Sequence, residues 1–258
     1  MGLDIKIAIG INSFKQEKDL EKRELLCLES LRRCKEKNPN VTLYNIVNEK
    51  DNVNFKDFTT LKIKHPDKYP FVNELLDSLS NTDSDIIVFL NNDIVLNNTF
   101  FKQLEDGIET YPASRAHLHS LDSLDEDIKV QSYSVHGFDL FAFSNKWWKS
   151  NRQIFPEMYL GKPYWDTVYF IKCVTNSNFK ILNKLPPVIF HVDHQSTACK
   201  DQDQFENHNT KIAQTIPEMN KWWHFVQNVL LKRPSAGDIL WWTPAKNETE
   251  LEDNLFRK

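Results

Sequence analysis

The residues with the clearest chemical potential are a polar triplet and two histidines far downstream. Asn91, Asn92 and Asp93 directly follow one apolar run, and His191 and His194 follow another. A divalent cation that neutralises a diphosphate is held by few protein ligands, mainly carboxylate oxygens, and leaves positions open for phosphate oxygens. One carboxylate and one later imidazole would meet that need. The pattern therefore predicts a cation site for a diphosphate, and a simple polar turn is the alternative for the triplet.

The two histidines are alternatives for the same role. Alternation along the strand places His191 and Asp193 on one face, and His194 lies at the end of the strand. His191 is preferred by its position, and a hydrogen-bonded histidine without a metal is the competing interpretation of either residue. The pair alone does not predict zinc, because zinc sites have more ligands at regular spacing.

The elements that would position these side chains alternate between strand and helix over the first 110 residues. Such alternation is typical of an open α/β sheet, in which ligands bind just outside the carboxyl ends of the strands. Asn12 and residues 91–93 occupy two of those ends. Strands are expected at 5–14, 41–47, 59–63 and 86–90, and helices at 17–37, 71–79 and 99–109.

The second half of the chain has a different character. A polar segment over 114–134 is expected to be rich in loops. Apolar patterns predict strands at 135–144 and 188–192 and helices at 165–173 and 217–231. The resulting organisation is one domain over 1–200, with halves of about 1–110 and 111–200, and a helical extension and tail over 201–258.

Composition limits the functional classes. Lys and Arg number 32 against 36 Asp and Glu, a net charge of −4 that argues against nucleic acid as the partner. The 258 residues include only 6 glycines and no glycine-rich phosphate loop. We find no signal-peptide pattern or transmembrane run, and the four cysteines are widely separated, so we expect a cytoplasmic protein. Membrane contact would be peripheral at most, through Trp222 and Trp223.

Two segments together resemble a known superfamily. IKIAIGINSF, then a helix-rich interval and DSDIIVFLNNDIVL, resembles the GT-A superfamily of nucleotide-sugar-dependent glycosyltransferases, in particular its family-2-like members. The resemblance covers about residues 4–200. It implies a Rossmann-like α/β fold with a mostly parallel open sheet, helices on both faces and a smaller acceptor-side subregion. It also implies inverting transfer of a sugar from a nucleotide diphosphate-sugar to a hydroxyl of a glycan or glycolipid acceptor, with Mn²⁺ or Mg²⁺ as cofactor.

The resemblance assigns the cation to a strand-end acid and a late histidine. In that family the last acid of an acidic DxD motif contacts the metal, and Asp93 occupies its position. The first acid of the motif is replaced by Asn91, which implies a weaker or differently coordinated ion. The segment VIFHVDHQS is similar to the element that completes the metal site, with His191 or His194 as the ligand.

The resemblance also assigns a general base and the residues that contact the donor. Asp166 would take the proton of the acceptor hydroxyl, with Glu157 as the reserve base and a helix cap as the alternative role of Asp166. Gly137 would allow close approach of a ligand and Asp139 would bind sugar hydroxyls, the alternative being a strand with one bulge glycine. The residues assigned to the nucleotide-sugar are Asn12, Phe14, Asn91, Asn92, Asp93, Gly137 and Asp139.

Two other functions fit parts of the sequence. A metal-dependent hydrolase would hold zinc tightly through a cluster in the second half of the chain. A non-catalytic module with the same fold would bind a nucleotide-sugar or a glycan without turnover, consistent with the missing acid at position 91. The residues of the hydrolase would be His117, His119, His191, Asp193 and His194.

Overall fold

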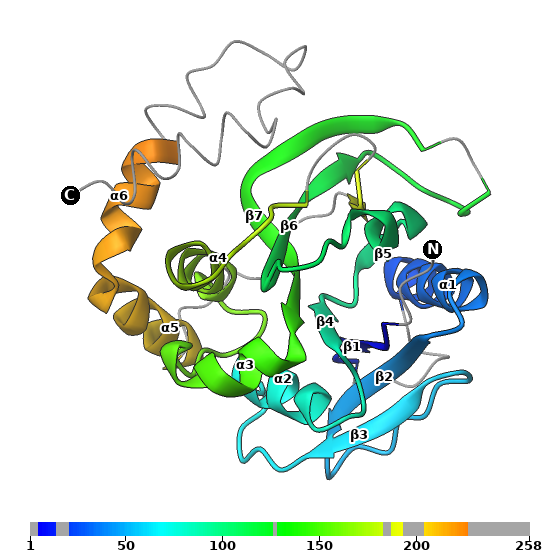
Figure 1. The fold of residues 1–258 in the computed structure, drawn as a ribbon, viewed down its shortest axis with the longest axis horizontal. Coiled ribbons are helices and arrows are strands. Elements are labelled where there is room, and N and C mark those ends of the chain that lie inside the picture. The colour runs from blue at the N-terminus through cyan, green and yellow to red at the C-terminus, as the bar shows by residue number, and fades with distance from the viewer. Residues whose placement is uncertain (1–4, 14–20, 126–127, 183–186, 193–203, 227–258) are drawn as a thin grey trace.

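The chain folds around one curved eight-stranded sheet with helices on both of its faces (Figure 1). The computed structural model describes residues 5–13, 21–125, 128–182, 187–192 and 204–226. The strands are β1 (Ile7–Ile11), β2 (Val41–Asn48), β3 (Thr59–Ile63), β4 (Ile86–Leu90), β5 (Ile94–Leu96), β6 (Thr110–Leu118), β7 (Val130–Ser144) and β8 (Ile189–Val192). The helices are α1 (Lys22–Lys37), α2 (Val72–Ser80), η2 (Asn98–Gln103), α3 (Asn145–Asn151), η3 (Arg152–Ile154), α4 (Trp165–Asn176), α5 (Gln204–Thr215) and α6 (Pro217–Phe225).

The sheet has the order β3-β2-β1-β4-β7-β6-β8-β5. The pairs β3–β2, β2–β1, β1–β4 and β6–β8 are parallel, whereas β4–β7, β7–β6 and β8–β5 are antiparallel. The sheet is therefore mostly parallel, as expected, and its parallel half contains β1 and β4. Because these two strands run side by side in the same direction, the polar residues that follow them meet at one edge.

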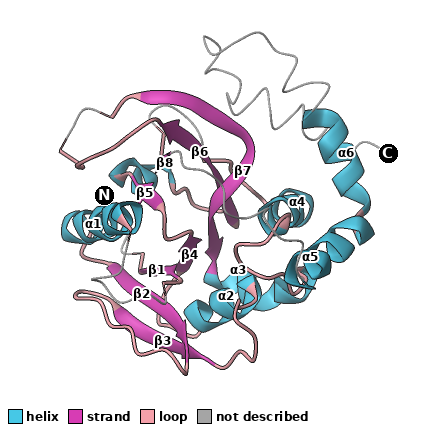
Figure 2. Cartoon of the chain, turned by 180° about the vertical axis from the view of Figure 1, so that it is seen from behind, coloured by secondary structure: helices cyan, strands magenta, loops and turns pink. Residues whose placement is uncertain are grey.

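Alternating side chains of β4 serve two separate cores. Ile86, Val88 and Leu90 pack in one apolar cluster with α1, whereas Ile87 and Phe89 belong to another cluster formed with α2, α3 and α4. Figure 2 shows α1 on one side of the sheet and α2, α3 and α4 on the other. A strand buried on both faces has no polar positions to alternate, which explains the continuous apolar sequence of β4.

Helix α1 has clear start and stop signals. Glu24 accepts a hydrogen bond from the backbone N–H of Glu21 (3.1 Å), one half of a capping arrangement at the helix start. The side chain of Asn38 donates to the carbonyl of Cys34 (2.7 Å), and Pro39 then prevents continuation of the helix. The first turn of α1 lies near the polar residues that follow β4, because Glu24 accepts a hydrogen bond from the side chain of Asn92 (2.6 Å).

Two expected elements are wrong. The helix expected over 99–109 is only the short η2, because Gly107 turns the chain (φ 80°) and Glu109 then pairs with the backbone of Asn178 (2.7 Å). The segment 114–134, expected to be rich in loops, supplies most of β6 and the start of β7, and only the described residues between these strands are loop. Their pairing contains register shifts, so its polar residues alternate irregularly and hide the strand pattern.

The C-terminal helices pack against α4. Asn209 of α5 is buried and accepts a hydrogen bond from the backbone N–H of Tyr159 (2.8 Å). Trp222 of α6 is fully buried beside Phe170 of α4 (ring centroids 4.8 Å apart), which in turn stacks on Phe138 of β7 (3.9 Å). Within the described part of the chain, no helix has the length and apolar character needed to cross a lipid bilayer.

Gly10 in β1 lies against α2, so a side chain there should destabilise the fold. A Cβ at Gly10 would lie 2.8 Å from Cδ1 of Leu79 and 2.9 Å from Cδ1 of Ile46. We expect Gly10→Val to lower the free energy of unfolding by about 1–3 kcal/mol through overpacking, measured by urea denaturation. Adding Leu79→Ala should make room, so the double variant should lose less stability than the sum of the two single losses. Strict additivity would contradict this packing.

Candidate active site

The candidate site lies where β1 and β4 end. Gly10 of β1 pairs with Phe89 of β4, so the residues after the two strands lie side by side. The β1 exit is held by Asn12, whose side chain donates to the carbonyl of Ile46 (2.6 Å). Asn45 of β2 adds hydrogen bonds to both the backbone N–H and the carbonyl of Ser13 (3.0 and 2.9 Å). The backbone of Asn12 and Ser13 at this edge is therefore tied to β2 by three hydrogen bonds.

Asp93 and His191 come together at this edge. A turn closed by the hydrogen bond from the N–H of Ile94 to the carbonyl of Asn91 (3.2 Å) leads into β5. In the antiparallel pairing of β5 with β8, Ile94 lies opposite His191. This register brings Nε2 of the buried His191 to 3.5 Å from Oδ2 of Asp93.

A second cluster surrounds the carboxylate of Asp139 in β7. Its Oδ1 accepts a hydrogen bond from the side chain of Asn91 (2.7 Å), and its Oδ2 accepts one from Nη1 of Arg115 in β6 (2.7 Å). Asp139 is only 5% exposed, so this carboxylate is compensated mainly by protein groups. The sugar hydroxyls expected to bind Asp139 would have to share these oxygens.

Asp166 lies beside this cluster, at the second position of α4. Its Oδ1 accepts a hydrogen bond from the N–H of Thr167 (2.8 Å), and its Oδ2 accepts a longer one from the N–H of Phe138 (3.4 Å). Burial and the negative charge of Asp139 raise the pKa of Asp166 to about 6, although these N–H groups and Arg115 oppose the shift. A carboxyl with such a pKa can exchange protons near neutral pH, as a general base must. Tyr164, not Asp166, occupies the N-cap position.

Gly137 makes room for protein atoms. A Cβ at this position would lie 2.9 Å from Oγ of Ser134 and 3.3 Å from Cζ of Arg115. Oγ of Ser134 also accepts a hydrogen bond from the N–H of Gly137 (2.8 Å). The absence of a side chain thus lets the guanidinium of Arg115 reach Asp139.

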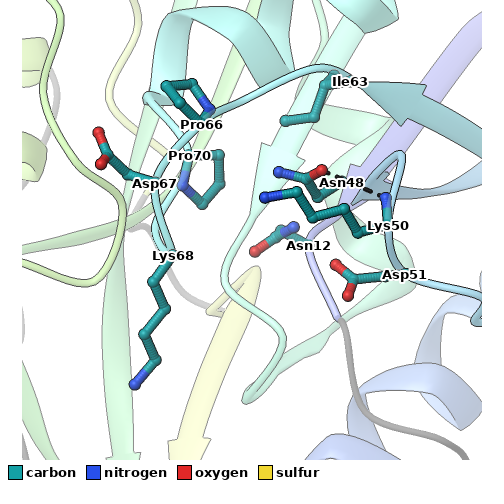
Figure 3. Close-up of a pocket in the computed structure, with 9 residues that line it drawn as sticks. All are labelled: Asn12, Asn48, Lys50, Asp51, Ile63, Pro66, Asp67, Lys68 and Pro70. Carbon is teal, nitrogen blue, oxygen red and sulfur yellow. Dashed lines mark hydrogen bonds between the residues drawn. The ribbon is translucent and has the colours of Figure 1, made fainter.

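Two cavities open where β1 and β4 end. The first, of about 340 Å³, is lined at the strand ends by Asn12, residues 91–93 and the first turn of α1, and on the opposite side by Tyr69, Pro70, Leu160 and Gly161. The second, of about 310 Å³, shares Asn12 and Pro70 with the first. Figure 3 shows Asn12 at its centre, between Lys50 and Asp51 on one side and the two prolines Pro66 and Pro70 on the other. A ligand with two linked parts would fit such a pair of hollows.

The remaining expected residues are more scattered. His117 lies edge-on to His191 (ring centroids 5.7 Å apart), whereas His119 and Glu157 are both exposed to solvent. Phe14, Asp193 and His194 lie outside the described residues. Across the described ranges, no group of three or more His, Cys, Asp or Glu side chains is arranged to hold a metal.

Sequence reasoning missed three charged residues of the site. Arg115 pairs with Asp139, and Arg23 of α1 places Nη1 3.9 Å from Oδ2 of Asp93. Glu24 is buried and accepts a hydrogen bond from the side chain of Asn92 (2.6 Å). Only Glu24 had a sequence signal, because an acid in the first turn of a helix is a common cap partner.

The raised pKa of Asp166 makes a prediction about stability. The folded protein binds this proton more tightly than the unfolded chain, whose carboxyl has its ordinary value of 3.8. The associated stability is therefore present below pH 3.8 and is lost as the pH rises through about 6. We expect Asp166→Asn, which cannot ionise, to raise the free energy of unfolding at pH 8 by up to about 3 kcal/mol, and to change it little at pH 4.

Urea denaturation at the two pH values measures this difference. Asp122→Asn is the control, because Asp122 is an exposed carboxylate paired with Lys22. A gain for Asp166→Asn that is equal at pH 4 and pH 8, or a loss at pH 8, would show that the ionised carboxyl carries no such cost.

Comparisons with known proteins bear on the fold. No protein-family model and no curated protein sequence matches the chain. Among solved structures, S. aureus TarS 1-349 in complex with UDP-GlcNAc superposes with a TM-score of 0.53 and 12% identity, covering 87% of this chain and 76% of that one. A second structure of S. aureus TarS 1-349 gives a TM-score of 0.51 and 12% identity over 96% and 80%.

A more distant match is 4-diphosphocytidyl-2C-methyl-D-erythritol synthase from Anaerococcus prevotii. Its TM-score is 0.42 at 11% identity, over 81% of this chain and 99% of that one. TarS is a glycosyltransferase of the GT-A fold. This chain therefore has a GT-A-like fold.

Proposed function

We propose that this protein transfers a sugar from a nucleoside diphosphate-sugar to a hydroxyl of a glycan or glycolipid acceptor, with inversion. The observation that carries the proposal is the 3.5 Å approach of His191 to Asp93, whose side chain lines a cavity at the strand ends. The similarity in fold to TarS, a protein whose structure contains UDP-GlcNAc, supports a ligand of this class. The carboxyl of Asp166, with a pKa of about 6, supports catalysis over binding alone.

Asp93 and His191 fit a cation such as Mn²⁺ or Mg²⁺. Ligands about 2.1 Å from one ion lie about 3.0–3.4 Å apart in octahedral or tetrahedral geometry. The separation of Oδ2 and Nε2 is 3.5 Å, close to that range. With two protein ligands, most coordination positions would be left to phosphate oxygens and water. A cation bound here would offset the negative charge that develops on the departing diphosphate.

The donor would span both cavities. Its diphosphate would lie in the cavity beside residues 91–93, and its nucleoside in the neighbouring one beyond Asn12. There the carboxylate of Asp51 can accept a hydrogen bond from an N–H group of a base, and the prolines 66 and 70 offer an apolar surface for its ring.

Asp166 would act as the general base for the acceptor hydroxyl. The carboxylate accepts the proton as the hydroxyl oxygen attacks the anomeric carbon and the bond to the diphosphate breaks. Arg115 and Asp139 shift the pKa of Asp166 in opposite directions. The guanidinium of Arg115 lowers it, and the carboxylate of Asp139 raises it.

Nucleotide binding tests the proposed cation site. We expect UDP, GDP or dTDP to bind the wild-type protein more tightly with Mn²⁺ than with EDTA, by calorimetry. In Asp93→Asn the gain in nucleotide affinity caused by Mn²⁺ should be at least about 10-fold smaller than in the wild type, because the variant lacks the anionic ligand. Asp122→Asn, the exposed control carboxylate, should keep it. Binding that ignores Mn²⁺ in the wild type, or an Asp93→Asn variant with the full enhancement, would contradict the proposed site.

The pH dependence of turnover tests the proposed base. Since the base must be ionised, release of UDP from a UDP-sugar should increase as the pH rises through about 6 and then level off. Asp139→Asn removes a neighbouring negative charge, which should lower the pKa of Asp166 and move the rising limb to lower pH. Asp125→Asn, on an exposed carboxylate paired with Arg33, should leave the limb in place. A limb that moves to higher pH in Asp139→Asn would contradict this assignment.

A further inference from the structure

Arg23 is held in an arrangement that neither the proposed cation site nor the fold explains. It is the second residue of α1 and lines the cavity that contains Asp93. One edge of its guanidinium is anchored, because Nε and Nη2 both donate to Oε2 of Glu21 (3.1 and 2.5 Å). Its other edge faces the site, with Nη1 lying 3.9 Å from Oδ2 of Asp93. The side chain is 24% exposed, so most of it is out of water.

The second edge of the guanidinium has no hydrogen-bond acceptor among the described residues. Nη1 of Arg23 is buried, and 3.9 Å is too long for a hydrogen bond to Asp93. A buried donor on a charged group is costly when it is left unsatisfied, more so than a neutral one. The arrangement is thus suited to an anionic acceptor that enters the cavity from outside.

The charge around the cavity points to the same acceptor. Asn91 and Asn92 are neutral, and the carboxylate of Glu24 accepts hydrogen bonds from Asn92 and from the N–H of Glu21. Asp93 would neutralise part of the charge of any divalent cation bound beside it. The remaining positive charge would then be smaller than the negative charge on a departing nucleoside diphosphate. A guanidinium aimed at the same place would supply the missing charge, and its planar fork suits phosphate oxygens.

We propose that Arg23 is a resident counter-ion for the diphosphate, pairing with Asp93 in the free protein and donating through Nη1 to a phosphate oxygen when the nucleotide binds. This inference rests on the proposed function, because it takes a nucleoside diphosphate as the ligand. The inference adds one consequence to the proposed function: part of the affinity for the diphosphate is independent of any divalent cation.

The test compares binding of a nucleoside diphosphate and of its nucleoside in EDTA. UDP, GDP and dTDP are screened with the wild-type protein by calorimetry, and the tightest of them is titrated into Arg23→Met alongside the matching nucleoside. We expect Arg23→Met to bind the diphosphate about 10- to 100-fold more weakly than the wild type in EDTA, the value of one charged hydrogen bond, with nucleoside binding unchanged. Mn²⁺ should restore part of the loss, since the cation then carries more of the charge.

Lys22→Met is the matched control. It removes a positive charge from the adjacent residue, whose ammonium pairs with the exposed Asp122, and neither of these two residues lines the cavity. This variant should bind the diphosphate within about 2-fold of the wild type, because surface charges are screened by salt. Arg23→Lys keeps the charge but loses the anchored fork, so an intermediate affinity is expected, and it also serves if Arg23→Met fails to fold.

The outcomes separate this inference from the proposed function. If the wild type binds a nucleoside diphosphate and Arg23→Met binds it equally well in EDTA, the role of Arg23 is wrong and the proposed function stands. Equal losses in Arg23→Met and Lys22→Met would likewise overturn it, since general charge alone would then explain the effect. If the wild type binds none of the three nucleotides with or without Mn²⁺, the proposed function fails and this inference fails with it.

Discussion

The antiparallel pairing of β5 with β8 is the constraint on which the site depends. It comprises three residue pairs, yet its register sets Ile94 opposite His191 and thereby places the imidazole beside Asp93. On its other side β8 pairs in parallel with β6, where His117 lies next to His191. Because side chains alternate along a strand, a slip by one residue would turn His191 to the opposite face. The approach of these two groups is therefore a property of strand register, which a mobile loop could not hold.

The ion pair of Arg115 with Asp139 links the two halves of the site. A partly buried pair of this kind adds little net stability, because removing both charges from water offsets most of their attraction. Its effect on neighbouring groups is larger: Asp139 orients the side chain of Asn91, and both partners act on the pKa of Asp166. The edge that carries Asp93 and the helix that carries Asp166 are thus coupled through one carboxylate.

Periodic and buried elements were predictable from the sequence, whereas contacts between distant elements were not. β3 and β4 have the expected bounds, and Asp93 and His191, expected to share one cation site, lie 3.5 Å apart, Asp93 after β4 and His191 within β8. β5 has only three residues, too few for a pattern, and the register shifts of β6 and β7 disguise their alternation. A single arginine carries no spacing signal. The positions of Arg23 and Arg115 follow from tertiary packing alone.

The amides at positions 91 and 92 have a local physical cause. The side-chain nitrogen of Asn91 donates to Asp139 at 2.7 Å, and that of Asn92 donates to Glu24 at 2.6 Å. A carboxylate at either position would set two acceptors, both negatively charged, at hydrogen-bond distance, and one of them would have to be protonated or displaced. The acid that the resemblance leads one to expect at position 91 is therefore incompatible with an ionised Asp139. Negative charge at this edge is kept on Asp139 and Glu24, which are held by donors, and on Asp93, which faces His191 and Arg23. The departure from the DxD pattern therefore has a structural reason: the neighbouring strand β7 and α1 already supply carboxylates here. Of the three positions of the motif, only Asp93 keeps a carboxylate directed at the cavity.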